Sequence, residues 1–292
     1  MTLAKYKKMS NIINRADNKI DVNDFTRLTR LHLDHVWLTY EPQALFELWC
    51  LSDSDEQKNI IEFLIKNFSY IDGRKLAEGS QLISNQIQNV WNLKSSNTFL
   101  LATCDDNKPD GSQTLIQNLK NKFDISWKES NFFNSIVSGA NEIPTDSNII
   151  LVDDFIGTGD TITRKLEYIN RKINERGLNV FSIKIVSLAS MNFSIEILNG
   201  LSTEYYSVHW LKKGISELLS DGKKEVATRS MEELEKKLKK KYHGKQIPNF
   251  GYKKSESLFA LESNNIPNNV FPIFWWPFLK GGVSRKTIFR RV

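Results

Sequence analysis

The stretch from Asn148 to Thr161 constrains this chain more than any other part of the sequence. It reads Asn-Ile-Ile-Leu-Val-Asp-Asp-Phe-Ile-Gly-Thr-Gly-Asp-Thr. The aliphatic run from Ile149 to Val152 is typical of a strand that is buried on both faces of a parallel sheet. Two adjacent carboxylates, Asp153 and Asp154, follow at the point where that strand ends. The stretch therefore predicts a strand with an acid pair at its carboxyl edge, where open α/β sheets bind ligands.

A turn built for an anion follows the acid pair. Gly157 and Gly159 let the backbone approach a ligand closely, and Thr158 and Thr161 add hydroxyl donors. A helical pattern then runs to about Glu175, and the start of a helix offers unpaired N–H groups and a positive dipole to a phosphate. The acid pair can hold sugar hydroxyls or the hydration shell of a magnesium ion. Together these features predict a site for a sugar phosphate.

The order of acids and glycines excludes two other phosphate-binding motifs. No Gly-Lys-Ser/Thr sequence is present, so the turn is not a Walker A loop. In a Rossmann fingerprint the acid follows the glycines by about twenty residues, whereas here the acids precede them. An ordinary strand-to-helix turn rich in Asp and Gly is the remaining alternative. It is disfavoured because unpaired acids at the end of a buried strand are costly without a ligand.

The motif resembles the phosphoribosyl diphosphate (PRPP) loop of type I phosphoribosyltransferases. The signature is four apolar residues, two acids, two apolar residues and a short Thr/Ser/Gly run. The resemblance implies an α/β fold with a parallel sheet flanked by helices, and it implies that Asp153 and Asp154 contact the ribose and hold Mg²⁺ directly or through water. It implies a 5′-phosphate site made by the five residues of the turn, Gly157, Thr158, Gly159, Asp160 and Thr161.

Two positions depart from the pattern of this family. Relatives that act on 6-oxopurines carry an acid at the position of Gly157, where it serves as a base near the purine. Glycine cannot do this, so salvage of hypoxanthine or guanine is disfavoured. Asp160 places an acid inside a phosphate-binding turn. This is tolerable if its side chain points outward.

The other parts of a transferase site are less clearly marked. The resemblance places a pyrophosphate-binding loop after the first core strand, where Cys104 to Ser112 lies, and Lys108, Gly111 and Ser112 are its candidates. A plain surface turn is the alternative. The family's flexible catalytic loop is expected between Asp124 and Ser147.

Trp275 and Trp276 stand between two prolines near the C-terminus. They can stack on a base or on exposed nucleic acid, as a hood over the acceptor. A core plug is the competing interpretation, because aromatic clusters between prolines commonly pack inside. The nearby segment from Asn264 to Asn269 can bond a base edge or simply form turns.

The alternation of elements predicts three regions. A helical N-terminal lobe is expected over 1–94, an α/β core over 95–215, and a C-terminal basic helix with an aromatic hood over 216–292. The core strands are expected at 98–102, 149–152, 179–189 and 204–210, with helices at 113–122 and 161–175. The basic tract Lys236–Lys241 is expected on a helix over Ser230–Tyr242, either as a solvated surface or as a contact to nucleic acid.

Composition limits the binding partners and the cellular compartment that we expect. The formal net charge is +6, which suits nucleic acid or a polyanionic substrate such as PRPP. The two cysteines, Cys50 and Cys104, lack metal or redox spacing and fit a reducing compartment. The longest apolar run, Val270 to Leu279, is too short to span a bilayer and holds two prolines. No signal peptide is apparent, so we expect a cytoplasmic protein without a membrane partner.

The layout of the whole chain resembles the phosphoribosyltransferase-like proteins of bacterial conflict systems, including those encoded beside retron reverse transcriptases. This implies a Mg²⁺- and PRPP-dependent transferase in antiphage defence, with a reverse transcriptase or nucleic acid as a partner. One alternative is a PRPP or nucleotide sensor that binds nucleic acid or a protein. Another is a nucleotide or NAD glycohydrolase that uses the same pocket with water as acceptor. The sequence selects no acceptor, and it leaves a homo-oligomer open.

Overall fold

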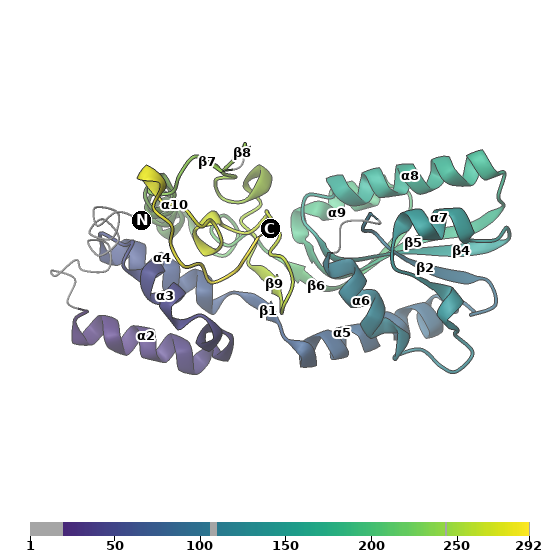
Figure 1. The fold of residues 1–292 in the computed structure, drawn as a ribbon, viewed down its shortest axis with the longest axis horizontal. Coiled ribbons are helices and arrows are strands. Elements are labelled where there is room, and N and C mark those ends of the chain that lie inside the picture. Colours follow the sequence, from purple (N-terminus) through teal and green to yellow (C-terminus); the bar gives the residue numbers. More distant parts are fainter. Residues whose placement is uncertain (1–19, 106–109, 243, 292) are drawn as a thin grey trace, which may run out of the picture.

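A five-stranded sheet forms the centre of the α/β half of the protein in its computed structural model, which describes residues 20–105, 110–242 and 244–291 (Figure 1). The strands follow the order β3-β2-β4-β5-β6, and every neighbouring pair is parallel. Their bounds are β2 Thr98–Ala102, β3 Phe132–Phe133, β4 Ser147–Ile156, β5 Val180–Met191 and β6 Glu204–Leu211. The expected α/β fold with a parallel sheet is confirmed.

Helices cover both faces of this sheet. One face shares a hydrophobic cluster with α5 (Gly73–Asn85), which a π-helical turn extends to Val90, and with α6 (Gly111–Lys120). The other face shares a cluster with α7 (Ile136–Glu142), α8 (Asp160–Arg176) and α9 (Ile195–Gly200). Burial on both faces explains why the middle of β4 is apolar without interruption.

The strand order changes direction between β2 and β4. β3 lies on one side of β2, whereas β4, β5 and β6 follow on the other side. The connections that leave the C-terminal ends of β2 and β4 enter α6 and α8, which cover opposite faces of the sheet. A crevice at such a switch point is the usual ligand site of open α/β sheets. Asp153 and Asp154 lie at this point, near the end of β4.

A separate hydrophobic cluster joins the N-terminal helices to the C-terminal segment (Figure 1). Its helices are α2 (Val22–Asp34), α3 (Pro42–Trp49), α4 (Asp55–Lys66) and α10 (Asp221–Lys236). Beside it, β1 (Ser69–Ile71) pairs in parallel with β9 (Phe259–Leu261). The lobe and the tail therefore share one core. The division of the chain at residues 94 and 215 stays a prediction.

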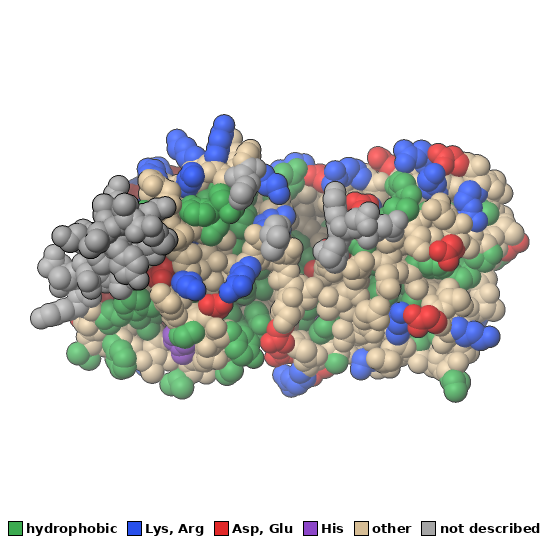
Figure 2. Space-filling view, in the orientation of Figure 1, with side chains coloured by type: hydrophobic (Ala, Val, Ile, Leu, Met, Phe, Trp, Pro, Cys, Tyr) green, Lys and Arg blue, Asp and Glu red, His purple; other side chains and the backbone are tan. Residues whose placement is uncertain are grey.

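Short elements complete the described chain. A two-stranded hairpin consists of β7 (Lys241–Tyr242) and β8 (Lys245–Gln246). Single 3₁₀ turns lie at Val36–Tyr40, Glu129–Asn131, Asn192–Ser194, Tyr252–Lys254, Pro272–Phe274 and Lys280–Gly282. The described residues contain no helix that is long and apolar enough to cross a membrane. The space-filling view shows hydrophobic side chains gathered at the end of the molecule formed by α2 and the turn after it, where Val22, Leu33 and Val36 are exposed (Figure 2).

The helix expected over Ser230–Tyr242 was placed wrongly at both ends. α10 begins at Asp221 and ends at Lys236, so most of the basic tract lies beyond it. Glu235 is buried, and the backbone N–H of Phe250 donates to its two carboxylate oxygens at 3.0 and 3.1 Å. Burial raises the pKa of Glu235 to about 8. The packing against the tail, rather than the charge pattern, therefore decides where this helix lies.

We expect Gly139→Ala to destabilise the fold, because α7 packs on β2 at this residue. A Cβ there would overlap the buried side chain of Leu101. Overpacking of this kind typically costs about 1–3 kcal/mol of unfolding free energy. Gly222 of α10 has no neighbour within 4 Å of a Cβ, so Gly222→Ala is the matched control and should stabilise by up to about 1 kcal/mol. Urea unfolding of both variants measures the difference, and equal effects would refute this packing.

Candidate active site

The acid pair lies where the end of β4 meets the start of α6. Asp153 is buried, and the backbone N–H of Phe155 donates to its Oδ1 at 3.4 Å. The Asp154 carboxylate packs directly on Gly111, the first residue of α6, so that a Cβ at this position would overlap it. Residue 111 must therefore be glycine, because the carboxylate of Asp154 occupies the space that any Cβ would need.

A third acid stands beside the pair. Asp110 is the N-cap of α6, and its Oδ1 accepts from the backbone N–H of Ser112 at 3.0 Å and from the Ser112 hydroxyl at 2.5 Å. Burial and then the charge of Asp110 raise the pKa of Asp153 to about 7. Burial, followed by the charges of Asp153 and Asp110, raises the pKa of Asp154 well above its usual value. The three carboxylates thus repel one another, which favours either a proton or a cation among them.

The acid cluster of Asp110, Asp153 and Asp154 has the donor chemistry of a magnesium site that the substrate completes. No ion pair to any of the three occurs among the residues that the structure describes. The same residues contain no group of three or more His, Cys, Asp or Glu side chains placed to hold a metal ion by themselves. Mg²⁺ commonly takes one or two carboxylates and completes its shell with substrate phosphates and water. The residues present fit that arrangement.

The turn after β4 leaves a helix terminus without a side-chain cap. Gly159 is the N-cap of α8 with φ +84°, a left-handed conformation that favours glycine. Ile197 of α9 packs beside Gly159. Its Cγ2 atom lies 2.9 Å from the position that a Cβ on Gly159 would take. No side chain caps the first N–H groups of this helix, although Ser54, Asp72 and Asp110 cap other helices of the protein. An uncapped helix start behind glycines is suited to a phosphate.

Asp160 is turned from the phosphate position toward the tail. Its carboxylate forms an ion pair with Lys253 at 2.6 Å and accepts from the Tyr252 hydroxyl at 3.3 Å. The hydrogen bond from Lys253 lowers the pKa of Asp160. Thr158 also bonds its side chain to Asp160. Thr161 is exposed at the helix start.

Gly157 faces Asn269 of the tail. A Cβ at Gly157 would lie 2.5 Å from Nδ2 of Asn269, so no side chain fits at this position. The Asn269 amide donates to Ser255 Oγ at 3.1 Å, and the Asn269 carbonyl accepts from Ser255 Oγ and from the backbone N–H of Ser257, both at 3.0 Å. The tail thus fills the space beside Gly157 and leaves no room for an acidic side chain at this position.

The candidates for the pyrophosphate loop differ in their positions. Gly111 lies against the acid pair, as described above. Ser112 is fully buried, and its hydroxyl accepts from the backbone N–H of Cys104 at 3.2 Å, so it ties the loop to the end of β2. Lys108 lies outside the described residues. These roles toward pyrophosphate stay predictions.

The segment between Asp124 and Ser147 contains regular structure. It holds the edge strand β3 and helix α7, which the sequence did not indicate. Asn131 is buried, and its amide donates to the carbonyls of Ser95 and Thr98 at 2.7 and 2.9 Å. Glu129 forms an ion pair with Lys120. These polar side chains therefore hold the edge of the sheet together.

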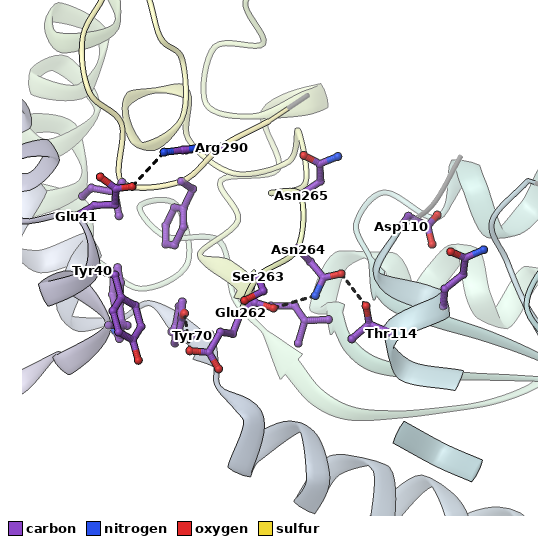
Figure 3. Close-up of a pocket in the computed structure, with 15 residues that line it drawn as sticks. Tyr40, Glu41, Tyr70, Asp110, Thr114, Glu262, Ser263, Asn264, Asn265 and Arg290 are labelled. Atoms are coloured by element: carbon purple, nitrogen blue, oxygen red, sulfur yellow. Dashed lines mark hydrogen bonds and ion pairs between the residues drawn. The ribbon is translucent and has the colours of Figure 1, made fainter. Parts of the chain in front are cut away.

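A cavity of about 800 Å³ opens between the α/β half and the shared core of lobe and tail, and Asp110 lies at its edge (Figure 3). Its far wall is aromatic. The ring of Trp37 stacks on Tyr70 at 5.1 Å and on Phe289 at 5.5 Å between ring centres. Asn264 of the tail bridges to α6, because its Oδ1 accepts from the Thr114 hydroxyl at 2.8 Å. The cavity thus begins beside the acid cluster and ends at stacked rings.

Trp275 and Trp276 lie elsewhere, inside the core shared by the lobe and the tail. They are 6% and 3% exposed, and Nε1 of Trp275 donates to the carbonyl of Val270 at 2.9 Å. In this position neither ring is open to a base, and the burial favours the core plug that the sequence left as the competing interpretation. The aromatic wall of the cavity comes instead from Trp37, Tyr70 and Phe289.

Sequence reasoning missed Asp110 and Lys253 as members of this site, and it considered Asn269 only within a segment that could bond a base edge or form turns. Asp110 carried a usable signal, since Asp before Gly-Ser at the start of a helical pattern is a typical N-cap. Asn269 and Lys253 approach the phosphate turn only through folding of the tail, and no local pattern indicates this.

We expect Asp153→Asn to stabilise the protein more at pH 8 than at pH 5. The pKa of Asp153, about 7 in the folded protein, exceeds its usual value, so the folded state holds a proton that the unfolded state releases. Stability is therefore greatest at low pH and is lost as the pH rises through about 7. Asparagine removes this loss, and the melting temperature at pH 8 should rise by about 5 °C. Calorimetry at both pH values tests this, and a lower melting temperature at pH 8 would contradict it.

Comparison with solved structures finds phosphoribosyltransferases at low similarity. A hypoxanthine-guanine-xanthine phosphoribosyltransferase is 12% identical, with a TM-score of 0.35 over 50% of this chain and 81% of that one. A hypoxanthine phosphoribosyltransferase from Staphylococcus aureus is 12% identical, with a TM-score of 0.33 over 48% of this chain and 74% of that one. The UMP synthase of Leishmania donovani is 17% identical, with a TM-score of 0.32 over 51% of this chain and 32% of that one.

No curated protein matches the chain. The model of a protein family described as PRTase-CE matches residues 49–291, which include α4, the whole sheet and the tail that faces the phosphate turn. The family unit therefore contains the α/β half and the part of the shared core formed by α4, α10 and the tail, whereas α2 and most of α3 precede it. The chain belongs to the PRTase-CE family of phosphoribosyltransferases.

Proposed function

We propose that this protein transfers the phosphoribosyl group of PRPP to an acceptor that enters through the cavity beside Asp110. The observation that carries the proposal is the meeting of a buried acid pair with an uncapped, glycine-led helix start at the switch point of the sheet. The two features match the two ends of a ribose 5-phosphate. Membership of the PRTase-CE family supports the same reaction.

In this proposal, different residues bind the phosphate and the ribose. The N–H groups at the start of α8 bind the 5′-phosphate, and Gly157 and Gly159 allow it to approach. Asp153 and Asp154 accept from the ribose hydroxyls. The bond from carbon 1 of the ribose to pyrophosphate breaks, pyrophosphate leaves with the electron pair, and the acceptor's lone pair forms the new bond to carbon 1. Positioning and stabilisation of the developing charges supply most of the acceleration in such a site.

Magnesium would be held at the acid cluster together with PRPP, where it neutralises the leaving pyrophosphate. Gly111 keeps the start of α6 close to Asp154, so the N-terminal end of this helix faces the same region. The donor set is carboxylate oxygen, which suits Mg²⁺. The proton lost by the acceptor can pass to water or to one of the carboxylates with a raised pKa.

A second candidate function is a PRPP sensor without turnover. It is favoured by one observation, the regular structure of the segment in which the resemblance places the catalytic loop. Such a sensor would bind PRPP, would release no pyrophosphate, and would contact nucleic acid or a protein. Salt-independent affinity for nucleic acid would argue against phosphate contacts by the basic tract Lys236–Lys241.

A third candidate is a glycohydrolase of nucleotides or NAD, with water as the acceptor. Mass spectrometry of the products formed with PRPP and with NAD separates it from a transferase. The resemblance to conflict-system proteins supports the further proposal that the activity serves antiphage defence beside a reverse transcriptase. The test compares phage plating on cells that carry the wild-type gene with plating on cells that carry the acid-pair variant. The neighbouring genes are present in both cases.

We expect the double variant Asp153→Asn, Asp154→Asn to lose pyrophosphate release from Mg–PRPP by at least about a hundredfold, because it removes the groups that hold the ribose and the metal. The measurement is a coupled pyrophosphate assay with a panel of acceptors. Its matched control is Asp221→Asn on the exposed first turn of α10, which should keep full activity. Full activity of a folded double variant would refute the site.

A further inference from the structure

Asp160 places a negative charge inside the turn that the proposed function gives to a phosphate. It is the first residue of α8, where an acid suits the helix dipole but repels an anionic ligand. Among the described residues, the one ion pair of this carboxylate is that with Lys253 of the tail, at 2.6 Å. Arg164, one turn into the helix, donates instead to the Asp160 carbonyl at 3.3 Å and to the Thr161 hydroxyl at 3.5 Å. The charge of the Asp160 carboxylate is therefore balanced by a residue of the tail.

The backbone that carries Lys253 is strained. Among the described residues, eight other than glycine have a positive φ, and four of these eight lie within the seven residues 250–256, namely Phe250, Lys253, Lys254 and Glu256. Left-handed backbone is unfavourable for any residue with a Cβ. Such conformations persist only where the surrounding structure imposes them, and they gather at functional sites. An exposed ion pair alone is weak evidence of a role, but an ion pair presented by a strained segment is stronger evidence.

Buried contacts hold both ends of this strained segment, residues 250–256. At one end, the backbone N–H of Phe250 donates to the buried Glu235 carboxylate, as described above. At the other end, the Glu256 side chain is buried and accepts from the backbone N–H groups of Ile215 and Ser216, both at 2.8 Å. The core shared by the lobe and the tail therefore fixes the backbone between these two points.

The tail also contacts the phosphate turn at more than one point. The Tyr252 hydroxyl donates to the Asp160 carboxylate at 3.3 Å. Asn269 fills the space beside Gly157. A Cβ at Gly251 would lie 1.9 Å from the carbonyl oxygen of Asn269, so the strained segment packs tightly on this residue. The two parts of the tail thus form one unit that faces the turn.

We propose that Lys253 is a positioning residue of the phosphate site, which holds and neutralises the Asp160 carboxylate so that the start of α8 can bind the 5′-phosphate of PRPP. The inference rests on the proposed function for the identity of this anion. An unpaired carboxylate at the first residue of the helix would repel a phosphate dianion at close range. With the carboxylate paired, the N–H groups and the dipole of the helix act on the phosphate without this opposition. A lysine of the tail thus sets the affinity of the α/β half for its donor.

Two fragments of PRPP test the proposal at the two ends of the donor. Ribose 5-phosphate probes the turn, magnesium pyrophosphate probes the acid cluster, and calorimetric titration of the full chain measures both affinities. We expect Lys253→Met to weaken ribose 5-phosphate at least about fivefold, the effect of one unit charge at contact in water, and to leave pyrophosphate within about twofold. Lys253→Arg keeps the charge and should bind both fragments like wild type. Equal losses of the two fragments would indicate a merely structural role and would overturn the inference.

Lys254→Met is the matched control, because Lys254 is the next residue, carries the same charge, is exposed and has a φ of 54° against 52° for Lys253. It should leave the affinity for ribose 5-phosphate unchanged, and a loss equal to that of Lys253→Met would reduce the effect to net charge and contradict the proposal.

The double variant Asp160→Asn, Lys253→Met removes the ion pair without leaving a charge behind. If the lysine acts through the carboxylate, this variant should bind ribose 5-phosphate within about twofold of wild type, because the repulsion is gone. An affinity that stays as low as in Lys253→Met would make the lysine a direct ligand of the phosphate and would overturn its positioning role. Thermal unfolding confirms that each variant is folded.

The same titrations separate a failure of this inference from a failure of the proposed function. A wild-type chain that binds ribose 5-phosphate no more tightly than Lys253→Met overturns the inference and leaves the transfer reaction standing. A wild-type chain that binds neither ribose 5-phosphate nor Mg–PRPP overturns the proposed function and this inference with it. In pyrophosphate release, Lys253→Met should raise the KM for PRPP and leave kcat nearly unchanged, and a fall in kcat at constant KM would contradict the role in donor binding.

Discussion

Mutual repulsion among three carboxylates at one point of the sheet is the constraint on which the rest of the structure depends. β4 delivers two of them, and the N-cap of α6 delivers Asp110. Gly111 admits the Asp154 carboxylate, and burial raises the pKa values of Asp153 and Asp154. Such a cluster of carboxylates favours a cation among them, which is the reason that the proposed function includes magnesium. Strain of this kind is typical of functional sites rather than of stable cores.

The tail is as much a part of the site as the loop that first indicated it. Asn269 covers Gly157, and Lys253 forms an ion pair with the Asp160 carboxylate. Their placement depends on a core in which helices of the lobe and aromatic side chains of the tail pack together. Trp275 and Trp276 contribute to the site only from a distance, by filling this core. The lobe and the tail therefore act as one wall of the cavity, and the start of α6 acts as the other.

Local patterns predicted the parts of the fold that local physics decides. The apolar run of β4 follows from burial on both faces, and the helix predicted over 161–175 is α8. The strand Phe132–Phe133 was missed because two residues form no period. The bounds of α10 were wrong because burial of Glu235 against Phe250 outweighs an amphipathic charge pattern. The acid pair was predictable from its neighbours in sequence, whereas Asp110 reaches the pair and Asn269 reaches Gly157 through tertiary contacts.

The pairing of β1 with β9 has a consequence for the order in which the protein becomes competent. A growing chain presents the acid pair and the glycine turn as soon as α8 has left the ribosome, but β1 must wait for β9 to be translated before it has a partner. Contacts between segments so distant in sequence also form slowly. During this interval the acid pair and the glycine turn exist without the part of the cavity wall that the tail supplies. Synthesis therefore imposes a delay between the appearance of the acid pair and the completion of the cavity beside it.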